Sequence, residues 1–282
     1  MHYDRRLKRE VKENEYGSKY IDFLYNTKFG RFLLKFFVAR PIFSKISGLY
    51  YKTIFSKWKI KKFAKQYGIS VKKDELKKYH SFNDFFIRKK HPKKNKNKKE
   101  LVAIADGKLS VYPITDDLKL HIKHSVYSIE DILENKKIAS FFENGTCLVY
   151  RLAVSDNHRY NYIDDGKLAF HKKIKGNLHT IRPISAEYNV YVHNSREVNL
   201  FNTKNLGYVA QVEVGALLVG KIKNNGKTDF KKNDEKGYFE FGGSTIVVLL
   251  NKNIVFDEDI IKANNKNMEV QVTAGERIGI IS

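Results

Sequence analysis

The stretch Gly242-Gly243-Ser244-Thr245-Ile246-Val247-Val248-Leu249-Leu250 places a glycine pair and a serine directly before a run of aliphatic residues. Such a run is typical of a β-strand. Glycine allows backbone angles that other residues avoid, and its carbonyl is open to close approach. The stretch therefore predicts a strand entered through a turn or bulge. A chemical role is the alternative, because the Ser244 hydroxyl is placed to attack the carbonyl before it.

Short runs of β-branched and aromatic residues recur from residue 101 onward. Glycine or Asn/Asp turns separate them, such as Asp164-Asp165-Gly166 and Asn224-Asn225-Gly226. We therefore predict a β-rich catalytic domain over residues 101–282, built as an antiparallel barrel or sandwich. The predicted strands are Lys108–Tyr112, Thr146–Val154, Tyr188–Val192, Val209–Val214, Ala216–Ile222 and Thr245–Leu250.

Residues 1–90 follow a different pattern, with apolar residues at spacings of three and four. Ile46, Leu49, Tyr50, Ile54 and Trp58 follow this spacing, and lysines flank them. The pattern predicts amphipathic helices that lie in a membrane interface or, alternatively, pack on a domain core. Residues 91–100 are mostly basic and polar, which predicts a linker. The predicted fold class is therefore α+β, with N-terminal helices before the β-rich domain.

The positive charge is concentrated in the first third of the chain. The 282 residues carry a net charge of +22. Residues 1–100 hold 29 Lys and Arg against 9 Asp and Glu, whereas the remainder holds 24 against 22. This asymmetry indicates an anionic partner, either nucleic acid or an acidic membrane surface. The basic linker contains no aromatic residues for base stacking, which favours the membrane.

The chain contains one cysteine, Cys147, so no internal disulfide is expected, and a reducing compartment is the simpler interpretation. No run reaches the roughly 18–20 apolar residues of a membrane span. The best run, residues 32–43, is interrupted by Lys35 and Arg40. The N-terminus is not followed by a signal-type apolar stretch. We therefore expect a protein of the cytoplasm that at most lies on a membrane.

Two further segments contain residue types used in catalysis. His158 follows a predicted strand, between Asp156 and Arg159, and histidine is the usual proton-transfer residue near neutral pH. A histidine in a polar loop is, alternatively, only exposed. Asp106 lies in Ala105-Asp106-Gly107, which predicts a turn or a carboxylate that orients a histidine.

The residues of these segments and their order along the chain resemble those of the phosphatidylserine decarboxylase proenzymes over nearly the full length of the chain. The lead-in Ser81–Arg88 is also similar to that family. The other matching stretches are Ala105–Lys108, Arg151–Leu152, Asp156–Tyr160, Leu178–Pro183, Asn194–Glu197, Val212–Ala216, Val219–Gly220, Lys236–Phe239 and Gly242–Thr245.

The resemblance implies a proenzyme that cuts its own Gly243–Ser244 bond. Ser244 attacks the preceding carbonyl to form an ester, elimination leaves a dehydroalanine, and hydrolysis leaves a covalent pyruvoyl group. The products are a β chain, residues 1–243, and an α chain, residues 244–282. The matching aspartate, Asp106, and a histidine of the segment around His158 and Arg159 would form a charge relay with Ser244.

The resemblance also implies the reaction, phosphatidylserine to phosphatidylethanolamine and carbon dioxide in phospholipid biosynthesis. The pyruvoyl ketone provides the sink for the electrons left on the α-carbon, the role of PLP elsewhere. The sequence has no evident PLP or metal signature. His158 is the candidate acid that reprotonates the α-carbon.

One position departs from the family pattern. Many members carry a second histidine three residues after the first, and here that residue is Asn161. An amide cannot act as a general base, so His158 serves both steps, or His179 or His124 assists, or cleavage is slow or absent. Asn161, His179 and Thr245 are therefore supporting candidates.

The expected partners are phosphatidylserine and an anionic membrane surface at the cytoplasmic face of the cell membrane, where the protein is peripheral. The two chains form a heterodimer, a homo-oligomer is compatible with the family, and no nucleic acid or metal is expected. The alternatives are an inactive relative that never cleaves and a basic nucleic-acid-binding protein.

Overall fold

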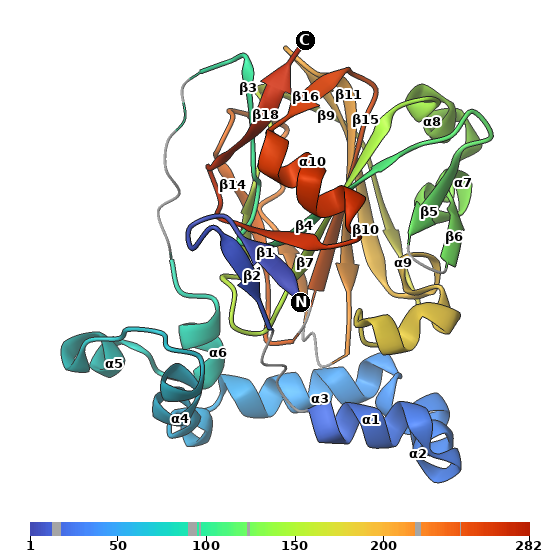
Figure 1. Cartoon of the computed structure of the whole chain (residues 1–282). Coiled ribbons are helices and arrows are strands. Elements are labelled where there is room, and N and C mark those ends of the chain that lie inside the picture. The colour runs from blue at the N-terminus through green and yellow to red at the C-terminus, as the bar shows by residue number, and fades with distance from the viewer. Residues whose placement is uncertain (13–17, 90–94, 96, 123–124, 218–220, 243) are drawn as a thin grey trace.

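The computed structural model describes residues 1–12, 18–89, 95, 97–122, 125–217, 221–242 and 244–282. It contains helices and strands in similar measure, which confirms the α+β class. The N-terminal helices lie beneath an assembly of sheets, and α10 (Glu258–Asn265) covers one sheet face (Figure 1).

A ten-stranded sheet forms the centre of the molecule, in the order β13-β9-β10-β11-β15-β7-β4-β17-β1-β2. The sheet is open from β13 to β2, so the barrel alternative is not observed. Its strands are β1 (His2–Asp4), β2 (Arg9–Val11), β4 (Gly107–Pro113), β7 (Thr146–Leu152), β9 (Gly166–Ile174), β10 (Arg196–Thr203), β11 (Gly207–Gly215), β13 (Asp229–Phe230), β15 (Ser244–Leu250) and β17 (Glu269–Val272).

Strand β15 is buried because it lies between β11 and β7 and has side chains in two cores. Alternate residues of a strand face opposite sides. Ile246 and Val248 therefore belong to one core, and Val247 and Leu249 belong to the other. All seven residues of β15 are buried.

Smaller elements cover both faces of the large sheet. The first core includes residues of two three-stranded sheets, in the orders β12-β14-β8 and β16-β18-β3. Short helices and a hairpin contribute to the second core. These arrangements are consistent with a sandwich. The elements are β3 (Glu100–Val102), β8 (Arg159–Asn161), β12 (Ile222–Asn224), β14 (Glu235–Phe239), β16 (Ile254–Phe256), β18 (Arg277–Ile281), β5 (Lys119–Ile122), β6 (Ser125–Ser128), α7 (Ile129–Leu133), α8 (Lys136–Ala139), η3 (Ser140–Phe142) and α9 (Val190–His193).

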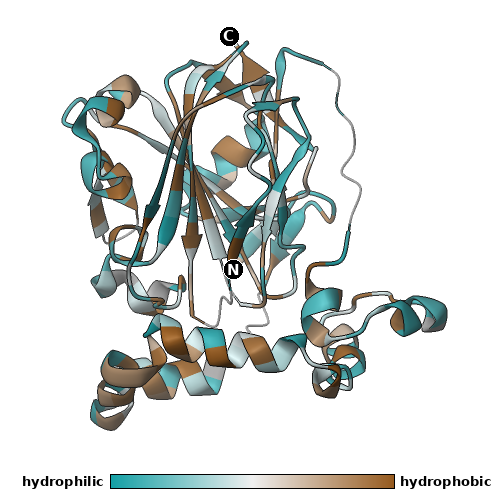
Figure 2. Ribbon diagram, turned by 180° about the vertical axis from the view of Figure 1, so that it is seen from behind, coloured by the Kyte–Doolittle hydropathy of each residue, from teal (hydrophilic) through white to brown (hydrophobic). Residues whose placement is uncertain are grey.

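The N-terminal helices form a layer that we call the helical base, residues 18–86. Thr27 caps one helix by accepting from the Gly30 amide, and Pro41 begins another. Hydrophobic residues recur along the helices of the base, interspersed with hydrophilic ones (Figure 2). Its elements are α1 (Ser18–Asn26), α2 (Lys28–Leu33), η1 (Leu34–Val38), α3 (Pro41–Lys52), η2 (Ile54–Ser56), α4 (Lys59–Gln66), α5 (Lys73–Lys78) and α6 (Phe82–Phe86).

Two strand predictions are corrected by the structure. The run Tyr188–Val192 contains the end of η4 (Pro183–Tyr188) and the start of α9, and Asn189 between them has a left-handed φ of 44°. Of the predicted strand Ala216–Ile222, Ala216, Leu217 and Lys221 lie outside the strands, whereas Ile222 begins β12; residues 218–220 lie outside the described chain.

The first eleven residues also differ from the helical pattern predicted for residues 1–90. They form β1 and β2 at one edge of the large sheet, where β1 pairs in parallel with β17. Strands of three residues are too short for alternation to be recognised. The predicted boundaries at residues 90 and 100 stay a prediction, and half of the linker, residues 91–94 and 96, lies outside the described residues.

Candidate active site

Ser244 is the first residue of β15 and is fully buried. Its backbone is opposite Gly215 of β11 and Leu152 of β7. The Ser244 Oγ has no hydrogen-bond partner among the described atoms, and neither has the Thr245 Oγ1 on the other face of the strand. A buried hydroxyl without a partner costs about 1–3 kcal/mol. The two hydroxyls therefore lower the stability of the fold at this position, which indicates that they serve another purpose.

The chain bends at Phe241 and Gly242, before the strand. Gly242 has a φ of 140°, a value that side chains disfavour and glycine accepts. Gly243, the predicted site of cleavage, lies outside the described residues. Its role therefore stays a prediction.

His158 lies just before β8 and is fully buried. Its ring packs on Phe86 of α6, with the ring centroids 4.2 Å apart. Nδ1 is 3.0 Å from the backbone oxygen of Asp156. A carbonyl only accepts hydrogen bonds, so in the neutral ring Nδ1 carries the proton and Nε2 carries a lone pair. Nε2 is buried and has no partner in the described part of the chain.

Burial lowers the pKa of His158 to about 4, although Asp156 and the Gly242 backbone favour the charged ring. The ring is therefore neutral near pH 7 and can accept a proton at Nε2. The influence of the Gly242 backbone also indicates that the ring lies near Gly242, two residues before Ser244. The predicted histidine and the predicted serine segment are thus brought together by the fold.

Asp106 lies at the same end of the sheet, just before β4. One of its carboxylate oxygens accepts a hydrogen bond from the Ala274 amide at 2.9 Å. A Cβ at Gly107 would lie 3.5 Å from the Leu152 Cα, so β4 is in close contact with the strand that pairs with Ser244. Two strand spacings of about 4.8 Å separate β4 from β15. Asp106 therefore directly precedes a strand that lies two places from the strand of Ser244.

A cluster of charged residues surrounds the backbone next to His158. The Lys108 Nζ is 3.1 Å from the Asp156 carboxylate, and both side chains are largely buried. Asp156 also accepts from the Ala153 amide at 2.8 Å. Burial lowers the pKa of Arg88, while the charges of Asp106 and Asp156 oppose that shift. Sequence reasoning gave no role to Lys108, although it lies only two residues after Asp106.

The supporting candidates differ in their surroundings. Asn161 is buried, and its backbone N–H donates to the Ile104 carbonyl at 2.9 Å. His179 stacks on Tyr188 and lies 3.3 Å from the Tyr25 hydroxyl through Nδ1. Burial lowers the pKa of His179 to about 4. The third candidate histidine, His124, lies outside the described residues.

His179 is linked to the serine strand through its backbone. The Asn194 amide donates to the His179 carbonyl at 2.9 Å and to the Gly215 carbonyl at 2.8 Å. Gly215 is the β11 partner of Ser244. The side chain of His179, in contrast, faces the helical base through Tyr25.

A largely apolar cavity of about 590 Å³ lies within the helical base and extends to Leu217. Phe82 lines it, and the Phe82 ring stacks on Phe86 with centroids 6.4 Å apart. Phe86 in turn contacts His158. Lys59 and Lys62 are the charged residues of its lining. The cavity therefore approaches the histidine from the helical side.

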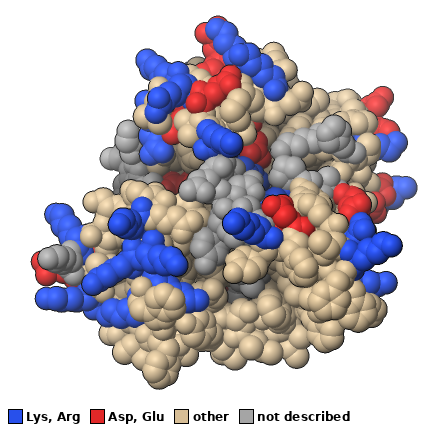
Figure 3. Space-filling view, turned by 60° about the horizontal axis from the view of Figure 1, so that its bottom comes forward, with Lys and Arg blue, Asp and Glu red and all other residues tan. Residues whose placement is uncertain are grey.

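The outer surface of the base carries a group of exposed apolar side chains that we call the apolar face. Soluble monomers rarely expose large contiguous apolar patches. Lysines and arginines gather to one side of this face (Figure 3). No helix in the described chain is long and apolar enough to cross a bilayer. The face comprises Tyr20, Phe23, Phe29, Phe32, Phe36, Phe37, Ile42, Phe43, Ile46, Leu49, Tyr50, Ile54, Phe55 and Trp58.

Comparison with known proteins identifies the family. Residues 82–280 match the family model described as phosphatidylserine decarboxylase. The chain is 47% identical to phosphatidylserine decarboxylase proenzyme 2 of Clostridium acetobutylicum, over 98% of this chain and 97% of that protein. It is 36% identical to the phosphatidylserine decarboxylase proenzyme of Clostridium kluyveri, over 99% and 98%. The chain therefore belongs to the phosphatidylserine decarboxylase family.

Proposed function

We propose that this chain is a proenzyme that cuts its own Gly243–Ser244 bond, acquires a pyruvoyl group at Ser244 and converts phosphatidylserine to phosphatidylethanolamine and carbon dioxide. The observation that carries the proposal is the buried Ser244 hydroxyl, unpartnered among the described residues, two residues after Gly242, whose backbone influences the neutral ring of His158. Its relatives are named as proenzymes, which supports processing.

Self-cleavage follows from the chemistry of these residues. The His158 Nε2 accepts the Ser244 hydroxyl proton while Oγ attacks the Gly243 carbonyl carbon. The Gly243–Ser244 C–N bond breaks, and the peptide becomes an ester. Loss of the Ser244 α-proton then expels the Gly243 carboxylate and leaves a dehydroalanine. Water hydrolyses this end group to a pyruvoyl ketone and ammonia, so no oxidant is required.

The residues around Ser244 fit a pyruvoyl group. Ser244 would contribute the three carbons of the pyruvoyl group. The residue before it is a glycine, which has no side chain to hinder attack on its own carbonyl. When formed, the ketone supplies an electron sink for decarboxylation of an amino acid. His158 is the residue that returns a proton to the α-carbon. A buried ring with a pKa of about 4 is almost entirely unprotonated at pH 7. Contact with the negatively charged carboxylate or phosphate of the substrate would favour the protonated ring.

The helical base supports a peripheral position at the cytoplasmic face of a membrane. Its apolar face would enter the interface, while Lys59 and Lys62 would meet anionic headgroups, each worth about 1 kcal/mol. The cavity that reaches Leu217 is lined mainly by apolar side chains and has a size typical of ligand pockets. It would take part of the lipid and present the serine headgroup to the His158 side.

Cleavage would leave the two chains joined without a covalent bond. The α chain, residues 244–282, would contribute β15 and β17 to the large sheet, where β chain strands flank each of them. The expected product is therefore a stable heterodimer. A homo-oligomer stays an expectation from the family.

Intact mass under denaturing conditions tests the first step. We expect one species ending at Gly243 and one beginning at position 244 that is lighter than a serine-started peptide by one ammonia. Release of carbon dioxide from carboxyl-labelled phosphatidylserine tests the second step. A single full-length mass, with no carbon dioxide released, would show that Asn161 marks an inactive relative.

A further inference from the structure

A second pocket, of about 450 Å³, lies between strands β9 and β10 of the large sheet and strand β12. We call it the β12 pocket. Its lining includes none of the candidate active-site residues Asp106, His158, Asn161 or Ser244. Its volume is in the range typical of small-molecule sites. It is therefore a distinct cavity that decarboxylation, as proposed above, does not use.

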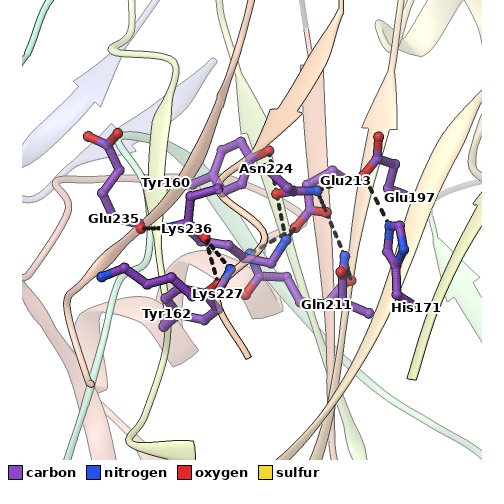
Figure 4. A network of polar contacts seen from close by, with 12 residues as sticks. Tyr160, Tyr162, His171, Glu197, Gln211, Glu213, Asn224, Lys227, Glu235 and Lys236 are labelled. Atoms are coloured by element: carbon purple, nitrogen blue, oxygen red, sulfur yellow. Dashed lines mark hydrogen bonds and ion pairs between the residues drawn. The ribbon is translucent and has the colours of Figure 1, made fainter. Parts of the chain in front are cut away.

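The floor of the β12 pocket is a buried polar network (Figure 4). The Lys236 Nζ donates to the Glu213 carboxylate at 2.8 Å, and both side chains are almost wholly buried. Lys236 also donates to the Asn224 Oδ1 at 2.7 Å. The Tyr160 hydroxyl donates to the same oxygen at 3.1 Å. These bonds fix the Asn224 amide so that its nitrogen faces the carboxylates.

A second carboxylate, Glu197, lines the pocket itself. It accepts from the Asn224 Nδ2 at 2.8 Å and lies 3.0 Å from the Lys173 Nζ and 3.3 Å from the His171 Nε2. The hydrogen bonds of Asn224, Lys173 and His171 lower the pKa of Glu197, although burial opposes this. Glu197 is therefore an ionised acceptor held in place at neutral pH.

Buried ion pairs of this kind add little net stability, because desolvation offsets their attraction. A hydrophobic pair would fill the same space between two sheets. The contribution of the network to the stability of the fold is therefore small. Its hydrogen bonds do hold acceptors and donors in fixed positions at the bottom of the pocket. Such a floor suits a ligand that carries hydroxyl groups.

Positive charge dominates the lining of the pocket. Five lysines line it, against the single carboxylate of Glu197. Lys173, Lys227 and Lys236 have carboxylate partners. Lys221 and Lys223 have none within 4.0 Å in the described chain. Two lysines in excess at one side of a pocket favour an anion, and the ammonium group is a common phosphate ligand.

From this arrangement we infer that the β12 pocket binds a small phosphate ester of a polyol. Lys221 and Lys223 bind the phosphate, and the Glu197–Asn224 floor binds the hydroxyls. Tyr162 and Phe201 provide the apolar wall against which the carbon chain packs. The same chemistry is present in a free glycerol phosphate and in the headgroup of phosphatidylglycerol.

Isothermal titration calorimetry on the full chain, at constant ionic strength, tests the inference without any activity readout. The probes are sn-glycerol 3-phosphate and inorganic phosphate. We expect a Kd below about 1 mM for the ester and a value roughly tenfold weaker for phosphate, because phosphate lacks the hydroxyl contacts. The double variant K221Q/K223Q should bind the ester at least about tenfold more weakly.

The matched control is K204Q/K252Q, which removes two exposed lysines outside the pocket and has the same net charge. It should bind the ester within twofold of the wild type. Equal losses in the two double variants, or no heat with either probe at 10 mM, would overturn the inference. Competition between the soluble ester and phosphatidylglycerol vesicles would assign the site to a lipid headgroup; binding of the ester that vesicles do not displace would assign it to a free ester.

Discussion

Helix α3 of the helical base and strand β15 of the ten-stranded sheet contain similar apolar residues but bury them to different extents. All seven residues of β15 are buried. On α3 the buried residues are the small Ser44 and Gly48, whereas Ile46 and Leu49 are 63% and 65% exposed. Burying one such side chain is worth about 1.5–3 kcal/mol. The apolar side chains of β15 therefore stabilise the fold by packing inside the protein. Those of α3 remain exposed and are free to contact an apolar environment outside the protein.

This difference separates two tasks that the molecule combines. Residues of the sheet region surround Ser244, and the base provides the exposed face and the cavity that approaches His158. Changes in the sheet should affect chemistry and leave membrane binding intact. Changes in the base should have the opposite effect.

The largest effect is expected from Ser244→Ala. Without the hydroxyl, neither the ester nor the pyruvoyl group can form, so cleavage and carbon dioxide release should be lost completely. Mass spectrometry and vesicle flotation should show a single chain that still binds membranes. Ser110→Ala, at a buried serine of β4, is the control and should still be cleaved. Two chains from the Ser244→Ala variant would refute the role of this serine.

Replacing Phe32, Phe36 and Phe37 together by serine should weaken vesicle binding at least about 100-fold, because each phenylalanine loses about 1 kcal/mol or more of interfacial burial. Cleavage should be unchanged, since these side chains are exposed. The control replaces the exposed Val255, Ile261 and Ile280 by serine. Equal losses of vesicle binding in both triple variants would mean that the apolar face has no special part in docking.

His158 should make the protein sensitive to acid. Its pKa is about 4 when folded and about 6.5 in an unfolded chain, so the unfolded state binds more protons between these values. The free energy of unfolding should therefore fall by about 3 kcal/mol as the pH drops from 7 to 4. Urea denaturation of His158→Gln should show a smaller fall than the wild type.

The exposed His121 supplies the control for this measurement. His121→Gln should reproduce the pH dependence of the wild type. Parallel curves for all three proteins would contradict the burial argument.

The smallest effect is expected from Lys59→Gln and Lys62→Gln. Each should weaken binding to anionic vesicles about fivefold at low salt, in line with about 1 kcal/mol per charge. The difference should disappear at high salt, because the surface charge is then screened. Lys136→Gln and Lys137→Gln on α8 serve as controls. Losses that persist at high salt would assign the two lysines a role in packing instead.

Part of this arrangement could be predicted from the sequence because it depends on local pattern. Strands Lys108–Tyr112, Val209–Val214 and Thr245–Leu250 are confirmed within a residue or two by β4, β11 and β15. Long aliphatic runs have a single stable position, the buried interior. Tyr188–Val192 is also rich in β-branched and aromatic residues, and it was predicted as a strand for that reason. Its helix makes contacts with distant residues, such as Tyr191 on Tyr127, which the sequence of the segment alone does not reveal.

The site shows the same limit. Ser244, His158 and Asp106 were predicted from short motifs, and the fold brings the segments of the first two together. The Lys108–Asp156 ion pair joins residues 48 positions apart, and the β1–β17 pairing joins opposite ends of the chain. Contacts of this kind depend on topology, so no local pattern predicts them.

The central position of β15 has a consequence for timing. Its neighbours β11 and β7 hold the backbone of Ser244, and Asp106 accepts its hydrogen bond from Ala274, eight residues before the end of the chain. A chain that cuts itself at this bond can do so only after segments on both sides of the bond have joined the sheet. Maturation would then act as a proofreading step, in which only molecules that have completed their fold become enzymes.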